Sequence, residues 1–312
     1  MSAPLVLVTG AVTHEERAQL IDAAPGVRLE FTERAGTDPD LLAVAEGLVG
    51  SPDAVELARA PRLRWVHSWA AGVDGIAADG VLPEPIASGR VLLTAAKGSG
   101  AAPLAEHVLL LLLMLTRDVP RWQRAQGERH WDRYQHGELL GARLGIIGAG
   151  RAGHELTTRA AAFGMDVLQV RRGHDRAELE ALLTTSDAIA VTAPATSETI
   201  GMLGDAEFAL CERHPYYVCV SRGGIADDRA LLRALRSGQL AGAGLDAHST
   251  EPLPQDSPFW HEPHVVVTPH NAATTRATRR RGLDVLTHNL AVFAAGGITG
   301  RFDGVVDPSA GY

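Results

Sequence analysis

Short apolar runs alternate with amphipathic stretches along most of the chain. In the N-terminal third, the apolar runs of strand length are Leu5–Val8, Val27–Phe31, Leu63–His67 and Arg90–Thr94. Polar and apolar residues recur at helical spacing between them, in His14–Ala23 and Asp53–Ala60. Strands that alternate with helical segments form βαβ units, and such units build a parallel sheet. We therefore expect the N-terminal third to fold as an α/β domain.

A second alternation starts at Leu144 and is more regular than the first. The apolar runs that predict its strands are Leu144–Ile147, Asp166–Val170, Ala188–Thr192, Tyr216–Val220, Ala241–Leu245 and Val265–Thr268. Helical patterns lie between most of these runs, at Gly153–Phe163, Arg176–Leu183 and Arg229–Ser237. The predicted fold class is therefore α/β, with two doubly wound parallel sheets.

Three further helices are predicted outside these alternating segments. They are a long apolar helix at Ala101–Arg117, a polar helix or continuation at Arg121–Tyr134, and a last helix at Thr274–Ala295. The apolar run Leu104–Leu115 is interrupted by Glu106 and His107. It is shorter than the ~20 residues that cross a bilayer. We expect a buried helix here and no membrane span.

Composition narrows the class of protein. The 312 residues include 29 basic and 37 acidic side chains, which gives a formal net charge of −8. A length of this order predicts about two domains. The charge balance does not favour a broad basic surface for nucleic acid. Two cysteines cannot form a disulfide framework or a cysteine-based zinc site. The N-terminus lacks the pattern of a signal peptide, and we expect a cytoplasmic protein.

A glycine-rich turn follows the strand predicted at Leu144–Ile147. Gly148, Gly150 and Gly153 form a GxGxxG pattern between that strand and a helix. The first glycine permits a tight turn, the second lets a pyrophosphate approach the backbone, and the third brings helix and strand together. The helix start presents N–H groups and the positive end of its dipole to the phosphates. The predicted cofactor-binding residues of this turn are Gly148, Ala149, Gly150, Arg151 and Ala152.

The end of the next strand indicates which dinucleotide binds. NAD sites carry an Asp or Glu there, which accepts hydrogen bonds from the ribose 2′-hydroxyl. Here Val170 is followed by Arg171 and Arg172. Two guanidinium groups attract a 2′-phosphate by charge and by paired hydrogen bonds. The alternative is that both are solvated loop arginines. NADP is therefore the preferred cofactor, with NAD as the alternative.

Polar residues follow each of the last three predicted strands. They are Arg222, Glu251 and His270. Strand ends of an open α/β sheet meet at the ligand crevice, so these side chains are expected to lie near one another. An Arg binds a carboxylate and polarises a carbonyl group, a His exchanges a proton with its oxygen, and a Glu orients that His and raises its pKa. This set predicts hydride exchange at a 2-oxo or 2-hydroxy acid.

Other candidate residues are interpreted as structural. A proline separates His261 from His264 and spoils the helical spacing of a zinc-binding histidine pair, so no metal site is predicted. His107, on the apolar helix, is interpreted as a buried or domain-boundary residue. Neither Cys211 nor Cys219 lies in a nucleophile motif.

Taken together, several segments resemble the D-isomer-specific 2-hydroxyacid dehydrogenases over nearly the whole chain. In order, they are Trp65–Asp74, Ala105–His107, Leu139–Gly150, Phe163–Met165, Pro194 with Thr199, Ser221–Gly223, Gly242–Asp246, Glu251–Leu253 and Thr268–His270. The resemblance implies a flavodoxin-like substrate domain (residues 1–97 and 276–312) and a Rossmann dinucleotide domain (residues 98–275), with a cleft between them. It also implies an NAD(P)-dependent enzyme that acts on CH–OH donors.

The same resemblance assigns roles to individual residues. It implies that Arg222, Glu251 and His270 are the catalytic triad. The backbone that would bind the substrate carboxylate is that of Ala71, Gly72 and Val73. The further cofactor-binding residues that it implies are Ala193, Pro194, Thr199, Val220, Ser221 and Asp246, the last of which would hold the nicotinamide carboxamide. The family is usually dimeric, and residues 131–133 would contribute to the dimer contact.

Three functions are weighed on this basis. The leading hypothesis is an NADP-preferring reductase of the glyoxylate and hydroxypyruvate type, a homodimer with no nucleic-acid or membrane partner. The second is an NAD-dependent dehydrogenase of an amino-acid-pathway 2-hydroxy acid such as 3-phosphoglycerate. The third is a dinucleotide-sensing, corepressor-like interaction protein. The complete triad disfavours the third, because a sensor needs no proton relay.

Overall fold

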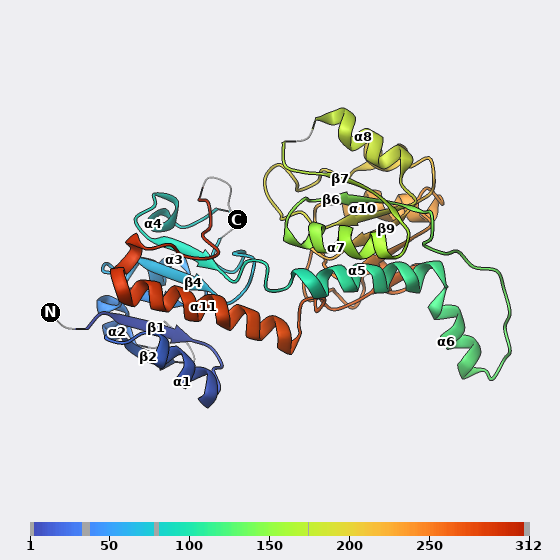
Figure 1. Cartoon of the computed structure of the whole chain (residues 1–312). Helices are drawn as coiled ribbons and strands as arrows, with labels where there is room; N and C mark the ends of the chain where they lie inside the picture. The colour runs from blue at the N-terminus through green and yellow to red at the C-terminus, as the bar shows by residue number, and fades with distance from the viewer. Residues whose placement is uncertain (1–2, 33–37, 78–80, 174, 309–312) are drawn as a thin grey trace. The chain divides into compact units, whose positions relative to one another are not determined.

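The chain folds into two compact units (Figure 1). The computed structural model describes residues 3–32, 38–77, 81–173 and 175–308. Unit 1 comprises Met1–Ser99 together with Thr275–Tyr312, and unit 2 comprises Gly100–Thr274. Unit 2 is thus inserted into the sequence of unit 1. Each unit has its own parallel sheet, which confirms the predicted α/β class.

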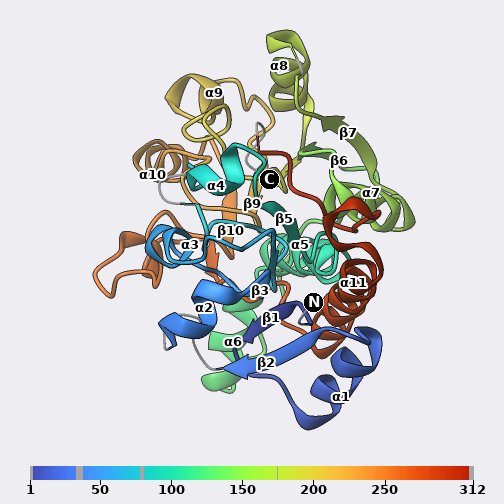
Figure 2. The same ribbon diagram turned by 90° about the vertical axis from the view of Figure 1, so that its left-hand side faces the viewer.

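Unit 1 contains five strands in the order β2-β1-β3-β4-β5. They are β1 (Leu5–Thr9), β2 (Arg28–Thr32), β3 (Gly47–Val49), β4 (Trp65–Ser68) and β5 (Leu92–Ala95). The helices of one face are α2 (Pro39–Val44), α3 (Ala54–Ala58) and α4 (Glu84–Ala87). Those of the other face are α1 (His14–Ala23) and α11 (Arg276–Gly296), as Figure 2 shows. A 3-10 helix, η3 (Gly297–Thr299), follows α11.

Strand β1 illustrates why both faces of this sheet are covered. Leu5 and Leu7 belong to the core that α2, α3 and α4 close. Val6 and Val8 belong to the core that α1 and α11 close. Successive residues of a strand point to opposite faces, so a strand that is apolar at every position must be buried on both sides.

Unit 2 contains six parallel strands in the order β11-β10-β9-β8-β6-β7. They are β6 (Arg143–Ile147), β7 (Asp166–Val170), β8 (Ala188–Val191), β9 (Tyr216–Cys219), β10 (Gly242–Leu245) and β11 (Val265–Val267). The helices that pack on one face are α5 (Ala101–Thr116) and α7 (Arg151–Ala162). Those on the other face are α8 (Arg176–Thr185), α9 (Asp205–Ala209) and α10 (Asp228–Arg236). The remaining helices are α6 (Val119–Gly127) and the 3-10 helix η2 (Pro258–Trp260).

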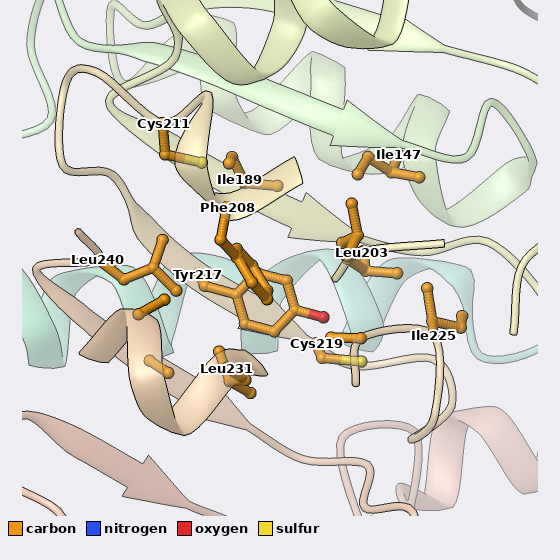
Figure 3. Packing of buried hydrophobic residues seen from close by; sticks show 14 of the residues in the cluster. Ile147, Ile189, Leu203, Phe208, Cys211, Tyr217, Cys219, Ile225, Leu231 and Leu240 are labelled. Atoms are coloured by element: carbon orange, nitrogen blue, oxygen red, sulfur yellow. The ribbon is translucent and has the colours of Figure 1, made fainter. Parts of the chain in front are cut away.

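The core beneath α8, α9 and α10 is built around two aromatic rings. Phe208 and Tyr217 meet edge to face, with ring centroids 6.0 Å apart (Figure 3). Cys211 and Cys219 are buried in the same cluster. Burial raises the pKa of Cys211 to about 12 and also raises the pKa of Cys219. Both thiols therefore stay protonated at neutral pH and act as small packing groups.

Helix α5 lies very close to β10 because that strand contains two glycines. A Cβ atom on Gly244 would lie 2.8 Å from the Cβ of Leu111, and one on Gly242 would lie 3.3 Å from a methyl carbon of Leu115. Helix and strand can approach this closely only when the strand residue has no side chain. Most apolar side chains of α5 are buried within unit 2. None of the described helices is both long and apolar enough to span a membrane.

The strand order reverses at one point in each sheet. In unit 2, the chain runs from β6 to β7 on one side of β6, and then crosses to β8 on the other side of β6. Ligands of open α/β sheets bind at the carboxyl ends of the strands at such a point. The turn after β6 lies against the loop after β8 here, since a Cβ atom on Gly148 would be 2.6 Å from the backbone nitrogen of Ala193.

Several segments differ from the sequence prediction. The short helices α2, α4 and α9 and the 3-10 helices η2 and η3 are not predicted, because they are too short to show a helical period. Strand β3 is not predicted, because its three residues follow closely on α2 and are too few to show a period. The helix predicted at Arg121–Tyr134 is wrong in its second half, because α6 ends at Gly127. Beyond that end the chain folds back. Asp132 forms an ion pair with Arg121, and the Tyr134 ring lies 3.9 Å from the Arg121 guanidinium carbon.

Candidate active site

The three predicted triad residues follow three adjacent strands of unit 2. Arg222 follows β9, Glu251 lies in the loop after β10, and His270 follows β11. These strands are parallel, so their carboxyl ends lie along one edge of the sheet. The three residues thus share one edge of one unit.

Glu251 and His270 are hydrogen-bonded to each other. The distance from His270 Nδ1 to Glu251 Oε2 is 2.7 Å. The other carboxylate oxygen accepts the backbone N–H of His248 at 2.9 Å. An ionised carboxylate only accepts hydrogen bonds, so Nδ1 carries a proton and Nε2 is the nitrogen that faces other partners. The side chains are 38% and 35% exposed, which leaves the pair accessible.

His270 adopts a backbone conformation that is uncommon outside glycine. Its φ angle is 49°, in the left-handed region. Such a conformation costs about 1–3 kcal/mol and persists where the surrounding structure holds it. The backbone N–H of His270 donates to the carbonyl oxygen of Thr268 at 3.1 Å. A tight turn therefore presents the imidazole.

A buried carboxylate anchors this turn. Asp246, directly after β10, is completely buried. Its Oδ1 accepts the Thr268 hydroxyl at 2.6 Å and the Asn271 N–H at 3.1 Å, and its Oδ2 accepts the Ala272 N–H at 3.0 Å. Asp246 thus lies beneath the His270 turn, and a contact with a nicotinamide carboxamide stays a prediction.

Arg222 is brought next to the Glu251 loop by the glycine that follows it. A Cβ atom on Gly223 would lie 1.9 Å from the carbonyl carbon of His248 and 2.1 Å from the nitrogen of Ser249. Only glycine permits this backbone contact. The Arg222 guanidinium donates to the Ser221 carbonyl oxygen at 2.7 Å.

The glycine turn has the shape of a dinucleotide cradle. A Cβ atom on Gly153 would lie 2.1 Å from the Gly148 carbonyl oxygen, so helix α7 packs directly on the turn. A Cβ atom on Gly150 would meet nothing within 4 Å. Gly150 is the N-cap of α7 and has no side chain with which to cap it. Open space therefore lies before a helix N-terminus, where a pyrophosphate binds favourably. Ala149, Arg151 and Ala152 complete this turn and the first residues of α7.

Further predicted cofactor residues lie along the same edge. The Ser221 hydroxyl, after Val220 at the end of β9, is buried and has no hydrogen-bond partner in the described part of the chain. An orphaned buried hydroxyl fits a site that a ligand completes. Thr199 donates its hydroxyl to the carbonyl oxygen of Pro194 at 2.7 Å and so closes the loop that begins at Ala193. Contacts of these residues with a nicotinamide dinucleotide stay a prediction.

Arg171 and Arg172 are both exposed after β7, which lies at one edge of the sheet of unit 2. Arg172 forms an ion pair with Glu198, with 3.3 Å between Nε and Oε2. The sequence reasoning missed Glu198, because its loop follows β8 and carries no recognisable motif. Glu198 therefore places a negative charge beside Arg172 at the predicted 2′-phosphate position.

Ala71, Gly72 and Val73 lie in unit 1, in the loop after β4. The Ser68 hydroxyl lies 3.3 Å from the Gly72 carbonyl oxygen and accepts the Ala70 N–H at 3.2 Å. The loop is thus held at the carboxyl edge of its own sheet.

Two histidines outside the predicted site join the His270 turn. His107, interpreted from the sequence as a buried or boundary residue, is mostly buried, and its Nε2 lies 3.0 Å from the Thr268 hydroxyl. His248 donates from Nε2 to the Thr268 carbonyl oxygen at 3.0 Å. His107 lies in the Ala105–His107 segment that carries the family resemblance, whereas no motif marks His248. Among the described residues, no group of three or more His, Cys, Asp or Glu side chains is arranged to hold a metal ion.

Comparison with known proteins identifies relatives of the whole chain. Residues 109–272 match the family model of the D-isomer specific 2-hydroxyacid dehydrogenase, NAD binding domain. A glyoxylate reductase of Korarchaeum cryptofilum is 33% identical over 293 residues, which cover 89% of this chain and 86% of the relative. A D-3-phosphoglycerate dehydrogenase of Mycobacterium tuberculosis is 34% identical over 304 residues, which cover 91% of this chain. The chain spans only 56% of the length of that relative.

A solved structure shows the same architecture. The NADPH-dependent glyoxylate/hydroxypyruvate reductase of Sinorhizobium meliloti, in complex with NADP and sulfate, superimposes with a TM-score of 0.79. It is 28% identical, and the match covers 99% of this chain and 100% of that one. By sequence and by structure, the chain belongs to the D-isomer specific 2-hydroxyacid dehydrogenase family of NAD(P)-dependent oxidoreductases that act on CH–OH donors.

Proposed function

We propose that this chain reduces a small 2-oxo acid of the glyoxylate and hydroxypyruvate type, with NADPH as the preferred cofactor. The observation that carries the proposal is the 2.7 Å contact between Glu251 and His270 on a sheet that also carries a dinucleotide-type glycine turn. Interconversion of a carbonyl and an alcohol needs a proton-exchanging group together with a nicotinamide site.

His270 is the acid in this proposal. Because Glu251 engages Nδ1, the Nε2 nitrogen gives its proton to the carbonyl oxygen during reduction and recovers it in the reverse direction. Glu251 stabilises the charged imidazolium and fixes the orientation of the ring. When bound, the nicotinamide ring supplies the hydride.

Arg222 and unit 1 bind the substrate in this proposal. The Arg222 guanidinium binds the carboxylate and polarises the carbonyl group. The backbone of residues 71–73, in unit 1, is also proposed to supply N–H donors to a substrate carboxylate. Glyoxylate and hydroxypyruvate are the substrates named for the Sinorhizobium meliloti structure, and a glyoxylate reductase is among the relatives.

The preference for NADPH rests on charge. Arg171 and Arg172 stand where NAD sites carry a carboxylate. Guanidinium groups there bind a 2′-phosphate and gain nothing from a 2′-hydroxyl. Kinetics with both cofactors test this preference, and a higher kcat/KM with NADH than with NADPH would contradict it.

Replacement of the acid tests the chemistry. We expect His270→Ala to lower kcat for glyoxylate reduction by about 10²–10⁴-fold and to leave the NADPH Kd, measured by fluorescence titration, within two-fold. His261→Ala, an exposed histidine of the same segment, is the matched control and should keep full activity. Near wild-type kcat in His270→Ala would rule out the proposed acid.

A second function is favoured by the mycobacterial relative. Oxidation of 3-phosphoglycerate with NAD is the candidate, since that D-3-phosphoglycerate dehydrogenase is 34% identical over 91% of this chain. Initial rates with glyoxylate, hydroxypyruvate and 3-phosphoglycerate separate the two. A kcat/KM for 3-phosphoglycerate above that for both 2-oxo acids would favour the second function.

We also propose a homodimer formed through residues 119–138. In Figure 1, α6 and the segment after it extend away from the sheet of unit 2. Trp131, in this segment, is 87% exposed. Exposed aromatic groups of this size mark contact surfaces. Light scattering should give a dimer for the wild-type chain and a monomer for Trp131→Glu, and a monomeric wild-type chain would contradict the proposal.

A further inference from the structure

We propose that His107 is a positioning residue for His270, and that it acts through Thr268 and Asp246. The proposal rests on the proposed function, in which His270 exchanges the proton. It concerns a helix residue of unit 2 that lies outside the strand ends.

The first step is the commitment of Asp246 to the His270 turn. Its side chain is completely buried, and the donors that it accepts come from residues 268, 271 and 272, on both sides of His270. A buried carboxylate is stable only when donors surround it. The backbone on either side of the imidazole is therefore held by one charged group.

The second step is the direction of the hydrogen bonds at Thr268. Its hydroxyl has one proton, and the 2.6 Å contact with Asp246 Oδ1 uses it, because an ionised carboxylate only accepts. The Thr268 oxygen then accepts from His107 Nε2, which lies 3.0 Å away. The His107 Nε2 is also 3.6 Å from Asp246 Oδ1. His107 thus holds the Thr268 side chain in one rotamer, in which the Thr268 hydroxyl faces Asp246 Oδ1.

The third step is that Thr268 is held from the Glu251 side as well. His248 donates from its ring to the Thr268 carbonyl oxygen and from its backbone to Glu251. Thr268 is therefore the point at which helix α5, the Asp246 carboxylate and the Glu251 loop meet, two residues before the acid.

His107 is well suited to hold this point. Helix α5 is pressed onto β10 at Gly244, so the imidazole projects from a rigid, enclosed element. The turn that it supports contains a left-handed His270, at a φ of 49°. A conformation that a free chain rarely adopts needs such support. Loss of the His107 donor should therefore displace the acid and leave the glycine turn of the cofactor site intact.

Two pairs of variants test the proposal. His107→Leu removes the donor, and His107→Gln keeps an N–H donor of similar reach. Thr268→Val removes the hydroxyl, and Thr268→Ser keeps it. We expect His107→Leu and Thr268→Val each to lower kcat by about ten-fold or more, because small displacements of a catalytic group are costly. His107→Gln and Thr268→Ser should keep kcat within about three-fold, and in every variant the NADPH Kd should change far less than kcat does.

The double variant and a control complete the experiment. If both residues act through one chain of hydrogen bonds, His107→Leu/Thr268→Val should be no slower than the slower single variant. Glu106→Gln, exposed on the same helix, should match the wild type. A kcat within two-fold in His107→Leu, losses that multiply in the double variant, or an NADPH Kd that weakens in step with kcat would each overturn the proposal.

Failure of this proposal is distinguishable from failure of the proposed function. If the His270→Ala variant is active, His270 is not the acid and the proposed function is wrong. An inactive His270→Ala together with a fully active His107→Leu would overturn only the role of His107. Should His107→Leu fail to fold, the Thr268→Val and Thr268→Ser pair gives the same comparison.

Discussion

The Glu251 carboxylate accepts the Nδ1 proton of His270 at 2.7 Å and thereby selects the tautomer that leaves Nε2 for a substrate. Its second oxygen is occupied by a backbone N–H at 2.9 Å. Both oxygens face donors, which an amide cannot do, because it presents one acceptor and one donor.

Replacement of Glu251 by Gln should therefore lower kcat without removing the cofactor. The amide loses the charge that stabilises the imidazolium and places an N–H₂ group against a donor. We expect kcat for 2-oxo acid reduction to fall about 10- to 100-fold, as measured by steady-state kinetics. Asp256→Asn, in the exposed part of the same loop, should behave as the wild type. A Gln variant within two-fold of the wild type would show that the charge is dispensable.

The Arg172–Glu198 ion pair indicates that a substitution of Glu198 should change the affinity for NADPH. Both side chains are more than half exposed, so the pair itself contributes less than about 1 kcal/mol. Glu198→Gln should remove a negative charge beside the predicted 2′-phosphate and tighten NADPH binding about two- to five-fold, with NADH unchanged. Glu180→Gln removes a similar exposed ion pair, on α8, and should change neither Kd. Equal tightening of both cofactors would contradict the predicted 2′-phosphate contact.

Two glycines of the same turn should respond differently to substitution. Gly150 has a φ of −77°, which any residue adopts, and open space around it. Gly150→Val should therefore lower the Tm only slightly, because Val is a poorer N-cap than Gly, and raise the NADPH Kd at least about ten-fold, since its methyl groups occupy the pyrophosphate position. Gly153→Ala should lower stability by about 1–3 kcal/mol, because its Cβ would lie 2.1 Å from the Gly148 carbonyl oxygen. Calorimetry and fluorescence titration measure these effects, and an unchanged Kd in Gly150→Val would place the cofactor elsewhere.

Because His67 is buried, we expect the stability of unit 1 to fall at acidic pH. His67 is completely buried in β4, and burial lowers its pKa to about 3 from an ordinary value of 6.5. Between these values the unfolded chain binds a proton that the folded chain does not, so stability falls as the pH is lowered from about 6.5 towards 3. Between pH 7 and pH 5 the loss is about 2 kcal/mol.

Hydrogen exchange of the β4 and β5 amides measures this loss within unit 1. The neutral variant His67→Gln keeps a group that can bond the Thr94 hydroxyl, which now lies 2.8 Å from His67 Nδ1. Its exchange protection should depend less on pH over this range. The same slope in the variant and the wild type would assign the acid sensitivity to other groups.

Much of the fold and of the candidate site follows from local pattern. Hydrophobic residues that recur at every second position locate strands, and those that recur about every 3.6 positions locate the helices between them. Once the strand ends are located, a parallel sheet brings Arg222, Glu251 and His270 to one edge without any knowledge of packing. The glycine turn is equally local, since strand, turn and helix are consecutive.

The remaining features depend on contacts between distant residues. The contact between His107 and Thr268 joins positions 161 residues apart, and no spacing rule reveals it. Glu198 meets Arg172 only because the ends of β7 and β8 flank that of β6. The segment after α6 has helical composition, yet the Arg121–Asp132 ion pair folds it back on the helix. Tertiary contacts decide each of these features.

The division of the chain into two units has a consequence for how such an enzyme diversifies. The acid, its carboxylate partner and the proposed arginine all belong to unit 2, whereas the proposed carboxylate-binding backbone of residues 71–73 belongs to unit 1. Each unit closes its own apolar cores. If residues 71–73 bind the substrate, replacing unit 1 by its counterpart from a relative is expected to change substrate choice, because the proton donor and its carboxylate partner belong to unit 2.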